Sequence, residues 1–373
     1  MKVLIRLDLN VPIKDGKVKD SARISNYTNY INKLVAKGDK ICIITHLGRP
    51  KNKDPELSTQ NLLKELERIW KINVKFLDSY ETNEIKNQLD KLEDKTILLL
   101  ENSRYFSFEK SNDLKQAKKI AQCFDKFIFD AFSTAHRKHL STNGITKFLP
   151  STLGETCKNE IKNLKQALDS KNPLIIMGGA KAQTKLELIE TFLNSASHIL
   201  VGGVLANTFL KAQGFTIQKS KYEPELVKFC KSLLQSSNSH KIILPFDFTV
   251  GETLETSKTR NTEILKENEL IGDIGPKTTE KFTSLIKESN TVIFNGPMGY
   301  TENTLFKESS VQILNAISNV NESFLGGGDT LKLMTLANKK TSQFTFVSMA
   351  GGAMLEFLAK NGELEVINEI ENR

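Results

Sequence analysis

Cysteine is scarce in this 373-residue chain. The four cysteines are Cys42, Cys123, Cys157 and Cys230. They form no CxxC pair, and their spacing fits neither a disulfide framework nor a zinc site. No apolar run approaches the roughly 18 residues that a membrane span needs, and Arg6 and Asp8 interrupt the apolar stretch that a signal peptide would require. We therefore expect a protein of the reducing cytoplasm that is neither secreted nor inserted into a membrane.

The motifs of several nucleotide-binding families are absent as well. The chain contains no GxxxxGK[ST] phosphate-binding loop, and no GxGxxG turn follows a predicted strand. The motif set of the protein kinases is also missing. These absences argue against P-loop enzymes, dinucleotide-dependent dehydrogenases and protein kinases. A nucleotide site in this chain would have to spread its phosphate contacts over several turns.

Positive charge is concentrated in the first part of the chain. Residues 1–150 contain 28 lysines and arginines against 19 aspartates and glutamates, whereas the other 223 residues contain 24 against 25. Six of the eight arginines lie in this first part. Because arginine binds phosphate or carboxylate through paired hydrogen bonds, the pattern favours a site for an acidic ligand. Charge alone leaves a generally basic surface or nucleic-acid binding open, but no basic run interleaved with aromatics supports a nucleic-acid groove.

Short apolar runs alternate with segments of helical periodicity along the whole chain. Nearly all-apolar strands separated by helices form parallel sheets that are covered on both faces. The strands are too numerous for one ordinary sheet, so the pattern predicts an α/β protein with two doubly wound parallel-sheet domains joined by a hinge helix. The expected strands are Lys2–Leu7, Ile41–Thr45, Thr96–Leu100, Phe127–Asp130, Leu174–Met177, His198–Val201, Lys241–Leu244, Thr291–Phe294, Phe324–Leu325 and Phe344–Val347. The expected helices are Asn61–Lys71, Leu114–Cys123, Cys157–Asp169, Glu223–Leu234, Thr278–Ser289 and Ser309–Ala316.

A domain boundary is expected near residues 150–172. Leu149–Gly154 is polar and rich in turn-forming residues, and the helical segment Cys157–Asp169 ends before Pro173. The predicted division has a basic N-terminal domain over 1–155, a hinge helix and linker over 156–172, a nucleotide-binding domain over 173–352, and a C-terminal helix and tail over 353–373 that returns towards the N-terminal domain.

Five glycine turns follow predicted strands in the second half. The carboxyl ends of parallel strands line the ligand crevice of an open sheet. Glycine lets the backbone approach a ligand closely, and the first amides of a following helix point at a phosphate there. One such turn is usually an ordinary loop, but five at one edge favour a nucleotide site. The turns are Gly178-Gly179, Gly202-Gly203, Gly296–Gly299, Gly326–Gly328 and Gly351-Gly352.

Eight short motifs, in order over about 350 residues, resemble those of the phosphoglycerate kinase family. They are Arg6–Pro12 with Arg23-Ile24, His46–Pro50, Glu101–Tyr105, Asp130–Arg137, Gly178–Lys181 with Lys185, Gly202-Gly203, Asn295–Gly299 with Glu302, and Gly326–Thr330. The resemblance implies reversible phosphoryl transfer between ATP and the carboxylate of 3-phosphoglycerate, with Mg²⁺, giving ADP and 1,3-bisphosphoglycerate in cytoplasmic glycolysis. It also implies a two-lobed monomer that closes by hinge bending and binds neither nucleic acid nor a membrane.

The resemblance further implies roles for individual residues. The residues implied to bind 3-phosphoglycerate are Asp8, Asn10, Arg23, His46, Arg49, Arg104 and Arg137. Those implied to bind ATP or ADP are Gly179, Lys181, Lys185, Gly202, Gly203, Asn295, Met298, Glu302, Gly327, Gly328, Asp329, Thr330, Gly351 and Gly352. Arg23 and Lys181 would contact the migrating phosphoryl group as the catalytic pair, and Asp329 would hold Mg²⁺. Because the acceptor carboxylate is ionised at neutral pH, no general base is expected, and catalysis reduces to positioning and charge neutralisation.

The chain departs from the family's pattern in a few places. It starts at its first strand, where family members carry a short preceding segment, so the resemblance implies a divergent member with a shortened N-terminus. Residues 348–354 read Ser-Met-Ala-Gly-Gly-Ala-Met, where the family has Ser-Thr-Gly-Gly-Gly-Ala-Ser. A left-handed backbone at Ala350 would be strained, and Met349 and Met354 lack a hydroxyl donor. We therefore expect reduced but real activity, and we expect the family's loop sequence to raise turnover.

Three hypotheses stand on the sequence. The first is an active phosphoglycerate kinase, which the retained Arg23, Lys181 and Asp329 favour. The second is a catalytically impaired relative that binds a nucleotide or a partner protein, which the altered residues 349–354 favour. The third, a nucleic-acid-binding protein, rests on charge alone.

Overall fold

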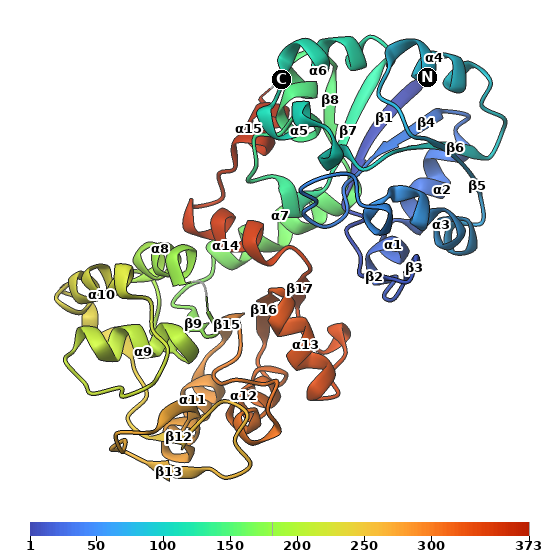
Figure 1. Ribbon diagram of the computed structural model, residues 1–373. Coiled ribbons are helices and arrows are strands. Elements are labelled where there is room, and N and C mark those ends of the chain that lie inside the picture. The colour runs from blue at the N-terminus through green and yellow to red at the C-terminus, as the bar shows by residue number, and fades with distance from the viewer. Residues whose placement is uncertain (181, 373) are drawn as a thin grey trace. The chain divides into compact units, whose positions relative to one another are not determined.

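The chain forms two compact units in a computed structural model that describes residues 1–180 and 182–372 (Figure 1). The first unit runs from Met1 to Ile161 and also contains the segment from Glu363 onwards, and the second is Lys162–Gly362. The boundary therefore falls inside helix α7 (Glu155–Leu168). Residues 353–362 belong to the second unit, so only the last part of the segment assigned to a returning tail joins the first.

A six-stranded parallel sheet forms the centre of the first unit. Its strands are the apolar runs of the sequence: β6 is buried along its whole length, and β1 is buried at five of its six residues. In spatial order the strands are β5 (Asn73–Leu77), β6 (Thr96–Leu100), β4 (Lys40–Ile44), β1 (Lys2–Leu7), β7 (Lys126–Asp130) and β8 (Ser151–Leu153). Every neighbouring pair is parallel, so all carboxyl ends lie at one edge.

Helices cover both faces of this first sheet. Successive strand residues point to opposite faces. Ile5 and Ile43 pack with Trp70 in a core under α1–α3, and Leu4 and Cys42 are buried on the other face, where α4 and α6 lie (Figure 1). The helices of the unit are α1 (Ala22–Asn26), α2 (Thr28–Ala36), α3 (Leu63–Trp70), α4 (Thr82–Asp90), α5 (Ser107–Ser111), α6 (Leu114–Ala121), the first part of α7, and α15 (Glu365–Glu371).

The second unit repeats this plan around its own six-stranded parallel sheet. In spatial order the strands are β11 (Ile242–Ile243), β10 (His198–Val201), β9 (Leu174–Met177), β15 (Thr291–Asn295), β16 (Glu322–Gly326) and β17 (Phe346–Ser348). The helices are α8 (Ala182–Phe192), α9 (Gly203–Ala212), α10 (Val227–Leu234), α11 (Pro276–Glu288), α12 (Glu308–Ile317), α13 (Gly328–Leu336) and α14 (Gly351–Ala359). One core joins Ile176 and Phe294 of the sheet to α11, α12 and α13, and α8 packs on α14. The predicted α/β class with two parallel-sheet domains is confirmed.

The sequence reading missed several strands. A three-stranded antiparallel sheet of β12 (Phe248–Gly251), β13 (Arg260–Thr262) and β14 (Leu270–Ile274) lies in the second unit. One of its two edge strands, β13, consists of polar residues of which Asn261 is exposed and the other two are half-buried, so it carries no apolar signal. β2 (Ile13–Lys14) and β3 (Lys17–Val18) form a small hairpin, and β5 was also missed. The stretch Leu149–Gly154 was taken for a turn-rich linker, but its centre is β8, a short edge strand that needs few apolar residues.

None of the helices over the described residues combines the length and the apolar character that a membrane crossing requires.

The buried carboxyl group of Asp273 makes the stability of the second unit depend on pH. Burial raises the pKa of Asp273 from 3.8 to about 7, although the amide of Ser309 donates a hydrogen bond to its carboxylate (3.2 Å). A carboxyl group with a higher pKa in the folded than in the unfolded chain holds its proton more tightly when folded, so this group's contribution to the free energy of unfolding falls between about pH 4 and pH 7. We expect Asp273→Asn to be more stable, relative to the parent protein, at pH 8 than at pH 5.

Urea denaturation at the two pH values measures this difference. A stability difference between variant and parent that is equal at pH 5 and pH 8 would contradict the prediction.

Candidate functional site

One edge of the first sheet carries the residues predicted to bind an acidic substrate. Because β1, β4, β6 and β7 are neighbours and parallel, the loops that follow them meet at that edge. These loops supply Asp8, Asn10, His46, Arg49, Arg104 and Arg137. The remaining predicted residue, Arg23, lies on α1 and reaches Asp8.

Asp8 positions Arg23. The Nη1 atom of Arg23 forms an ion pair with Oδ2 of Asp8, and the hydroxyl of Ser133 donates to the same oxygen (2.5 Å). The Arg23 side chain is 27% exposed, so it remains accessible to a ligand. Asp8 was expected to bind the substrate hydroxyl group, and in the structure its carboxylate is engaged with these two side chains.

The peptide groups of Gly48 tie three of the loops together. The amide of Gly48 donates to Oδ1 of Asn10 (2.8 Å), and Nη1 of Arg104 donates to the carbonyl oxygen of Gly48. Gly48 has a φ of +57°, and an added Cβ atom would lie 2.9 Å from a methyl carbon of Leu57. The loops after β1, β4 and β6 are therefore held in one arrangement.

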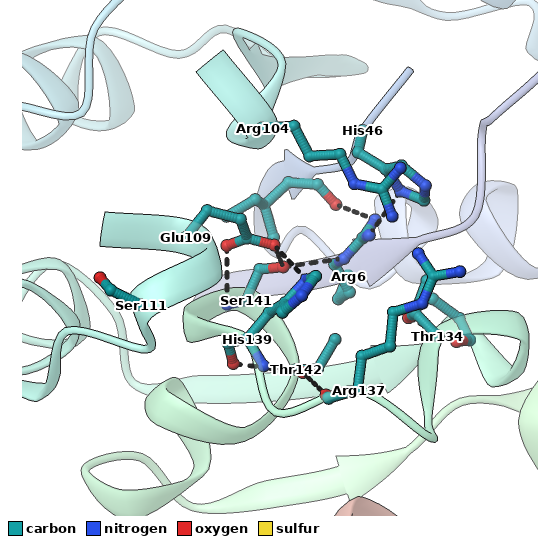
Figure 2. A network of polar contacts seen from close by, with 12 residues as sticks. Arg6, His46, Arg104, Glu109, Ser111, Thr134, Arg137, His139, Ser141 and Thr142 are labelled. Carbon is teal, nitrogen blue, oxygen red and sulfur yellow. Dashed lines mark hydrogen bonds and ion pairs between the residues drawn. The ribbon is translucent and has the colours of Figure 1, made fainter. Parts of the chain in front are cut away.

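His46 is an almost fully buried, neutral ring in the midst of cations. Its side chain is 3% exposed, and Nη2 of Arg6 lies 2.7 Å from its Nδ1 atom (Figure 2). Burial, followed by the charges of Arg6, Arg104 and Arg137, holds the pKa of His46 well below its usual value of 6.5. The ring is therefore neutral and offers a hydrogen bond rather than a charge.

Positive charge accumulates at this edge beyond what nearby carboxylates neutralise. Burial lowers the pKa of Arg104 to about 10, and the charges of Arg137 and Arg6 add to that shift. Burial and the charge of Arg49 likewise lower the pKa of Arg137. Cations that lower one another's pKa values are stabilised when an anion binds among them. The edge is therefore suited to a phosphate or carboxylate group.

Sequence reasoning missed the support beneath this edge. Arg6 is buried inside β1, and the buried carboxylate of Glu109 accepts hydrogen bonds from the hydroxyl (2.6 Å) and the amide (3.1 Å) of Ser141. Burial alone would raise the pKa of Glu109, but hydrogen bonds from His139 and Ser141 and the charge of Arg6 hold it below its ordinary value. His139, whose Nδ1 atom lies 3.6 Å from the Glu109 carboxylate, belongs to this support. An arginine within an otherwise apolar strand was the available signal for Arg6.

The glycine turns of the second unit pack backbone against backbone. Gly203 has a φ of +61°, and an added Cβ atom would lie 2.5 Å from the amide nitrogen of Gly179. A Cβ atom on Gly351 would lie 2.5 Å from the Cα atom of Gly327. Side chains are therefore excluded between these turns, at the carboxyl edge of the sheet.

Four helices begin at this glycine edge: α8, α9, α13 and α14. The first amides of a helix have no partner within it and carry the positive end of the helix dipole. An added Cβ atom on Gly328 or Gly352, at the starts of α13 and α14, would meet nothing within 4 Å. These two positions leave space beside the amides, which fits the approach of nucleotide phosphates.

Several residues predicted to bind the nucleotide make contacts within the protein. The Nζ atom of buried Lys185 donates to the carbonyl oxygens of Gly178 and Ala180 (3.1 Å for Ala180). The hydroxyl of Thr330 donates to the carbonyl oxygen of Gly326 (2.8 Å) and accepts from the amide of Gly296 (3.1 Å). Lys185 and Thr330 thus hold the glycine turns in place.

The other predicted nucleotide residues occupy contrasting positions. Asn295 donates to the carbonyl oxygen of Gly326 (2.6 Å), and Met298 is buried with its sulfur against Gly202. Glu302 lies exposed in a turn after β15. Lys181 lies outside the described residues.

Asp329 suits a magnesium ion that is shared with a nucleotide. Among the described residues, no three His, Cys, Asp or Glu side chains are grouped as a metal cage. Mg²⁺ is commonly held by one or two carboxylates together with phosphate oxygens and water. The Asp329 side chain is 65% exposed in the first turn of α13, where Lys332 pairs with it at 3.4 Å. A single accessible carboxylate beside a helix start with space for a phosphate fits that mode.

Comparison with known proteins agrees with this arrangement. The family model described as "Phosphoglycerate kinase" matches residues 1–361. The chain belongs to the phosphoglycerate kinase family. It is 34% identical to the phosphoglycerate kinase of Wolbachia pipientis subsp. Culex pipiens, over 96% of this chain and 93% of that protein. For the Dictyoglomus turgidum protein the identity is 37%, over 96% of this chain and 92% of that protein.

Solved structures show the same likeness. The structure of phosphoglycerate kinase from Coxiella burnetii matches with a TM-score of 0.86 and 33% identity, over 100% of this chain and 96% of that one. The enzyme from Pyrococcus horikoshii also gives a TM-score of 0.86, at 28% identity, over 99% and 96% of the two chains. The predicted family is confirmed, and with it the functional class, a phosphotransferase of glycolysis.

This member of the phosphoglycerate kinase family departs most from the family's pattern at residues 348–354. The loop that these residues form is unstrained. Ala350 has a φ of −110°, so the left-handed backbone considered for this position does not occur, and alanine costs nothing there. Its amide donates a hydrogen bond to the hydroxyl oxygen of Ser348 (3.1 Å). Helix α14 begins at Gly351, two residues before the predicted C-terminal helix and tail over 353–373, so both glycine amides belong to its first turn.

Met354 packs against the glycine turns at the carboxyl edge of the second sheet. Its side chain is fully buried, with its sulfur against Gly326 at the end of β16. Because Met354→Ser removes buried apolar volume and buries a hydroxyl, we expect it to lower the free energy of unfolding by at least about 2 kcal/mol. Met354→Leu, which conserves volume, should cost less than about 1.5 kcal/mol. Chemical denaturation of the two variants measures both values.

The structure corrects two premises of the expectation that restoring the family's loop residues raises turnover, namely backbone strain at Ala350 and a polar role for residue 354, whereas turnover itself stays a prediction. Ala350→Gly has no strain to relieve, and Met354→Ser loses core packing. A Met354→Ser variant as stable as the parent would contradict this correction.

Proposed function

We propose that this chain catalyses reversible phosphoryl transfer between ATP and the carboxylate of 3-phosphoglycerate, giving ADP and 1,3-bisphosphoglycerate, and that it does so as a monomer in the cytoplasm. The observation that carries the proposal is the crowding of Arg49, Arg104 and Arg137 at the carboxyl edge of the first sheet, where burial and neighbouring cations lower the pKa values of Arg104 and Arg137 and so favour an anion. The second unit supplies a glycine edge suited to nucleotide phosphates, and membership of the family supports the pairing of these substrates.

The first unit has the groups that 3-phosphoglycerate requires. Its phosphate group would be bound by the three arginines and by the neutral ring of His46, and Asn10 would help to orient the rest of the molecule. The acceptor carboxylate is already ionised at neutral pH, because the pKa of such a group lies near 4. No side chain has to remove a proton, so the chemistry reduces to bringing the reactants together and neutralising charge.

Arg23 and Lys181 are the proposed catalytic residues. Arg23 is held by Asp8 and partly exposed, so its guanidinium can transfer from that carboxylate to the developing charge on the migrating phosphoryl group. Lys181 would act on the same group from the nucleotide side. Asp329 would hold Mg²⁺, which when bound neutralises phosphate charge. The amides of Gly328 and Gly352 would bind phosphate oxygens, and Glu302 would bind the ribose hydroxyls.

A coupled assay tests the proposed function. Formation of 1,3-bisphosphoglycerate from ATP and 3-phosphoglycerate is followed through a dehydrogenase that consumes NADH. We expect turnover that requires both substrates and stops when EDTA removes Mg²⁺. ATP binding by calorimetry without any turnover would instead favour a catalytically impaired relative, the alternative suggested by residues 349–354.

We also propose that the 3-phosphoglycerate-binding unit and the nucleotide-binding unit close about α7. If each unit binds one substrate, both substrates together should lower the radius of gyration more than either one alone. Small-angle X-ray scattering with neither, either and both substrates measures this. The non-transferable ATP analogue AMP-PNP prevents turnover during the measurement, and an unchanged radius with both ligands bound would count against closure.

A further inference from the structure

Arg6 is a buried cation whose place in the fold the proposed function leaves unexplained. Its guanidinium lies within β1 and donates to the carbonyl oxygen of Leu7 (2.5 Å). Its Nε atom lies 3.0 Å from Oγ of Ser141, and its Nη2 atom lies 2.7 Å from Nδ1 of His46 (Figure 2). Charged side chains are almost never fully buried unless they are paired. The hydrogen-bond partners of the Arg6 guanidinium therefore indicate the role of this residue.

A directional chain of hydrogen bonds orients Arg6. The Oγ atom of Ser141 lies 2.6 Å from the carboxylate of Glu109, which can only accept. The single hydroxyl proton of Ser141 is thereby used, so its oxygen accepts from Nε of Arg6. The buried negative charge of Glu109 compensates the cation from the same side. Arg6 is thus fixed with its outer nitrogen directed at His46.

This geometry sets the protonation state of His46. A guanidinium group has only donors, so the Nδ1 atom that faces it must accept and carries no proton. A neutral imidazole with a bare Nδ1 atom carries its proton on Nε2. Over the described part of the chain, Arg6 is the only hydrogen-bond partner of the His46 ring. The N–H group of Nε2 therefore remains available to a ligand.

We propose that Arg6 is a positioning residue that holds His46 as the neutral tautomer protonated on Nε2, so that His46 donates one hydrogen bond to the anionic substrate throughout the physiological pH range. The role in substrate binding rests on the proposed function, whereas the protonation state does not. The charged and titratable groups around the ring are Arg6, Arg104, Arg137 and His139, with Glu109 behind Arg6. Burial and these cations also oppose protonation of the ring.

Nitrogen NMR on the unliganded protein tests the tautomer directly. The chain has five histidines, so the spectrum of ¹⁵N-histidine-labelled protein is simple, and the signals missing in His46→Gln identify His46. We expect an unprotonated Nδ1 and a protonated Nε2 that do not change between pH 5.5 and 8. A proton on Nδ1, or a ring that titrates in this range, would overturn the proposal without any substitution of Arg6.

Two variants test whether Arg6 sets the tautomer of His46. Arg6→Met removes the donor to Nδ1 and one of the cations that lower the pKa of His46, so this pKa should rise towards the ordinary histidine value and Nδ1 should gain a proton as the pH falls. Arg6→Lys, which retains a donor and no acceptor, should restore a bare Nδ1. Arg104→Met is the control, because it removes a neighbouring cation without touching Nδ1 and should leave the tautomer unchanged. An Arg6→Met protein that keeps a proton-free Nδ1 at pH 5.5 would show that Arg6 does not set the tautomer.

Kinetics test the role in binding. In Arg6→Met the ring becomes charged at low pH, and hydrogen bonds from charged donors are roughly twice as strong as neutral ones. The ratio of the KM for 3-phosphoglycerate in Arg6→Met to that in the parent should therefore fall about fivefold from pH 8 to pH 5.5. Using the ratio cancels titration of the substrate. A ratio that stays constant with pH would restrict Arg6 to a structural role, and a parent protein without turnover would refute the proposed function while leaving the NMR result intact.

Discussion

Replacing Arg23 with alanine is expected to lower turnover by about 10²–10³-fold, with little change in the KM for ATP. Arg23 lies at the proposed substrate site, is partly exposed, and is held in place by the carboxylate of Asp8. Its proposed action is on charge that develops only during transfer, and removing one such electrostatic contact costs roughly 2.7–4 kcal/mol of transition-state stabilisation. Steady-state kinetics in the coupled assay measure the effect.

Two further variants make the Arg23 result specific. Arg68→Ala removes another arginine of the same unit that pairs with a carboxylate, Glu65, and should leave turnover unchanged because it is exposed away from the proposed site. Arg23→Lys keeps the charge but loses the planar fork, so an intermediate turnover is expected. Near-normal turnover of Arg23→Ala would remove Arg23 from the proposed catalytic pair.

Replacing Gly203 with alanine is expected to destabilise the second unit and to abolish tight nucleotide binding. The backbone of Gly203 is left-handed, with a φ of +61°, which costs a residue with a side chain about 1–2 kcal/mol. The added Cβ atom would also lie 2.5 Å from the amide nitrogen of Gly179, and such overpacking typically costs about 1–3 kcal/mol. Together these effects predict that the free energy of unfolding falls by roughly 2–5 kcal/mol, which chemical denaturation measures. Calorimetry measures the affinity for ATP.

Gly214 provides the matched control for Gly203. Its φ is +89°, also in the left-handed region, but an added Cβ atom would meet nothing within 4 Å. Gly214→Ala should therefore lower the free energy of unfolding only through backbone strain, by about 1–2 kcal/mol. The variant should retain ATP binding. Equal losses of unfolding free energy in Gly203→Ala and Gly214→Ala would mean that the close contact between the glycine turns does not affect stability.

Local sequence patterns predicted the parts of the fold that bury continuous apolar runs. Strands such as Lys2–Leu7 and Thr96–Leu100 were predicted with the bounds that the structure has, because a fully buried strand must be apolar along its length. Arg260–Thr262 could not be found in this way, since a polar edge strand is defined by its partner's backbone rather than by its own side chains. The glycine edge was predictable because glycine marks close backbone contacts.

Local sequence patterns could not predict which side chains contact one another. Nothing in the sequence around Glu109 indicates that its carboxylate lies beneath Arg6, 103 residues earlier in the chain, because that contact depends on how the loops of three strands meet. The same holds for Lys185, for which the family resemblance implied a nucleotide ligand and whose ammonium group binds backbone carbonyl oxygens of Gly178 and Ala180. For Ala350 the family pattern suggested a glycine conformation that the backbone does not adopt.

The bonds that join Asn10 and Arg104 through Gly48 also bear on the entropy of substrate binding. Loops that move independently must each be ordered when a ligand arrives, and that loss of freedom subtracts from the affinity. Here three loops share one hydrogen-bonded junction before any ligand is present, so most of this loss has already occurred during folding. Substrate affinity at this edge should accordingly respond more to substitutions at the junction than their distance from the bound anion would suggest.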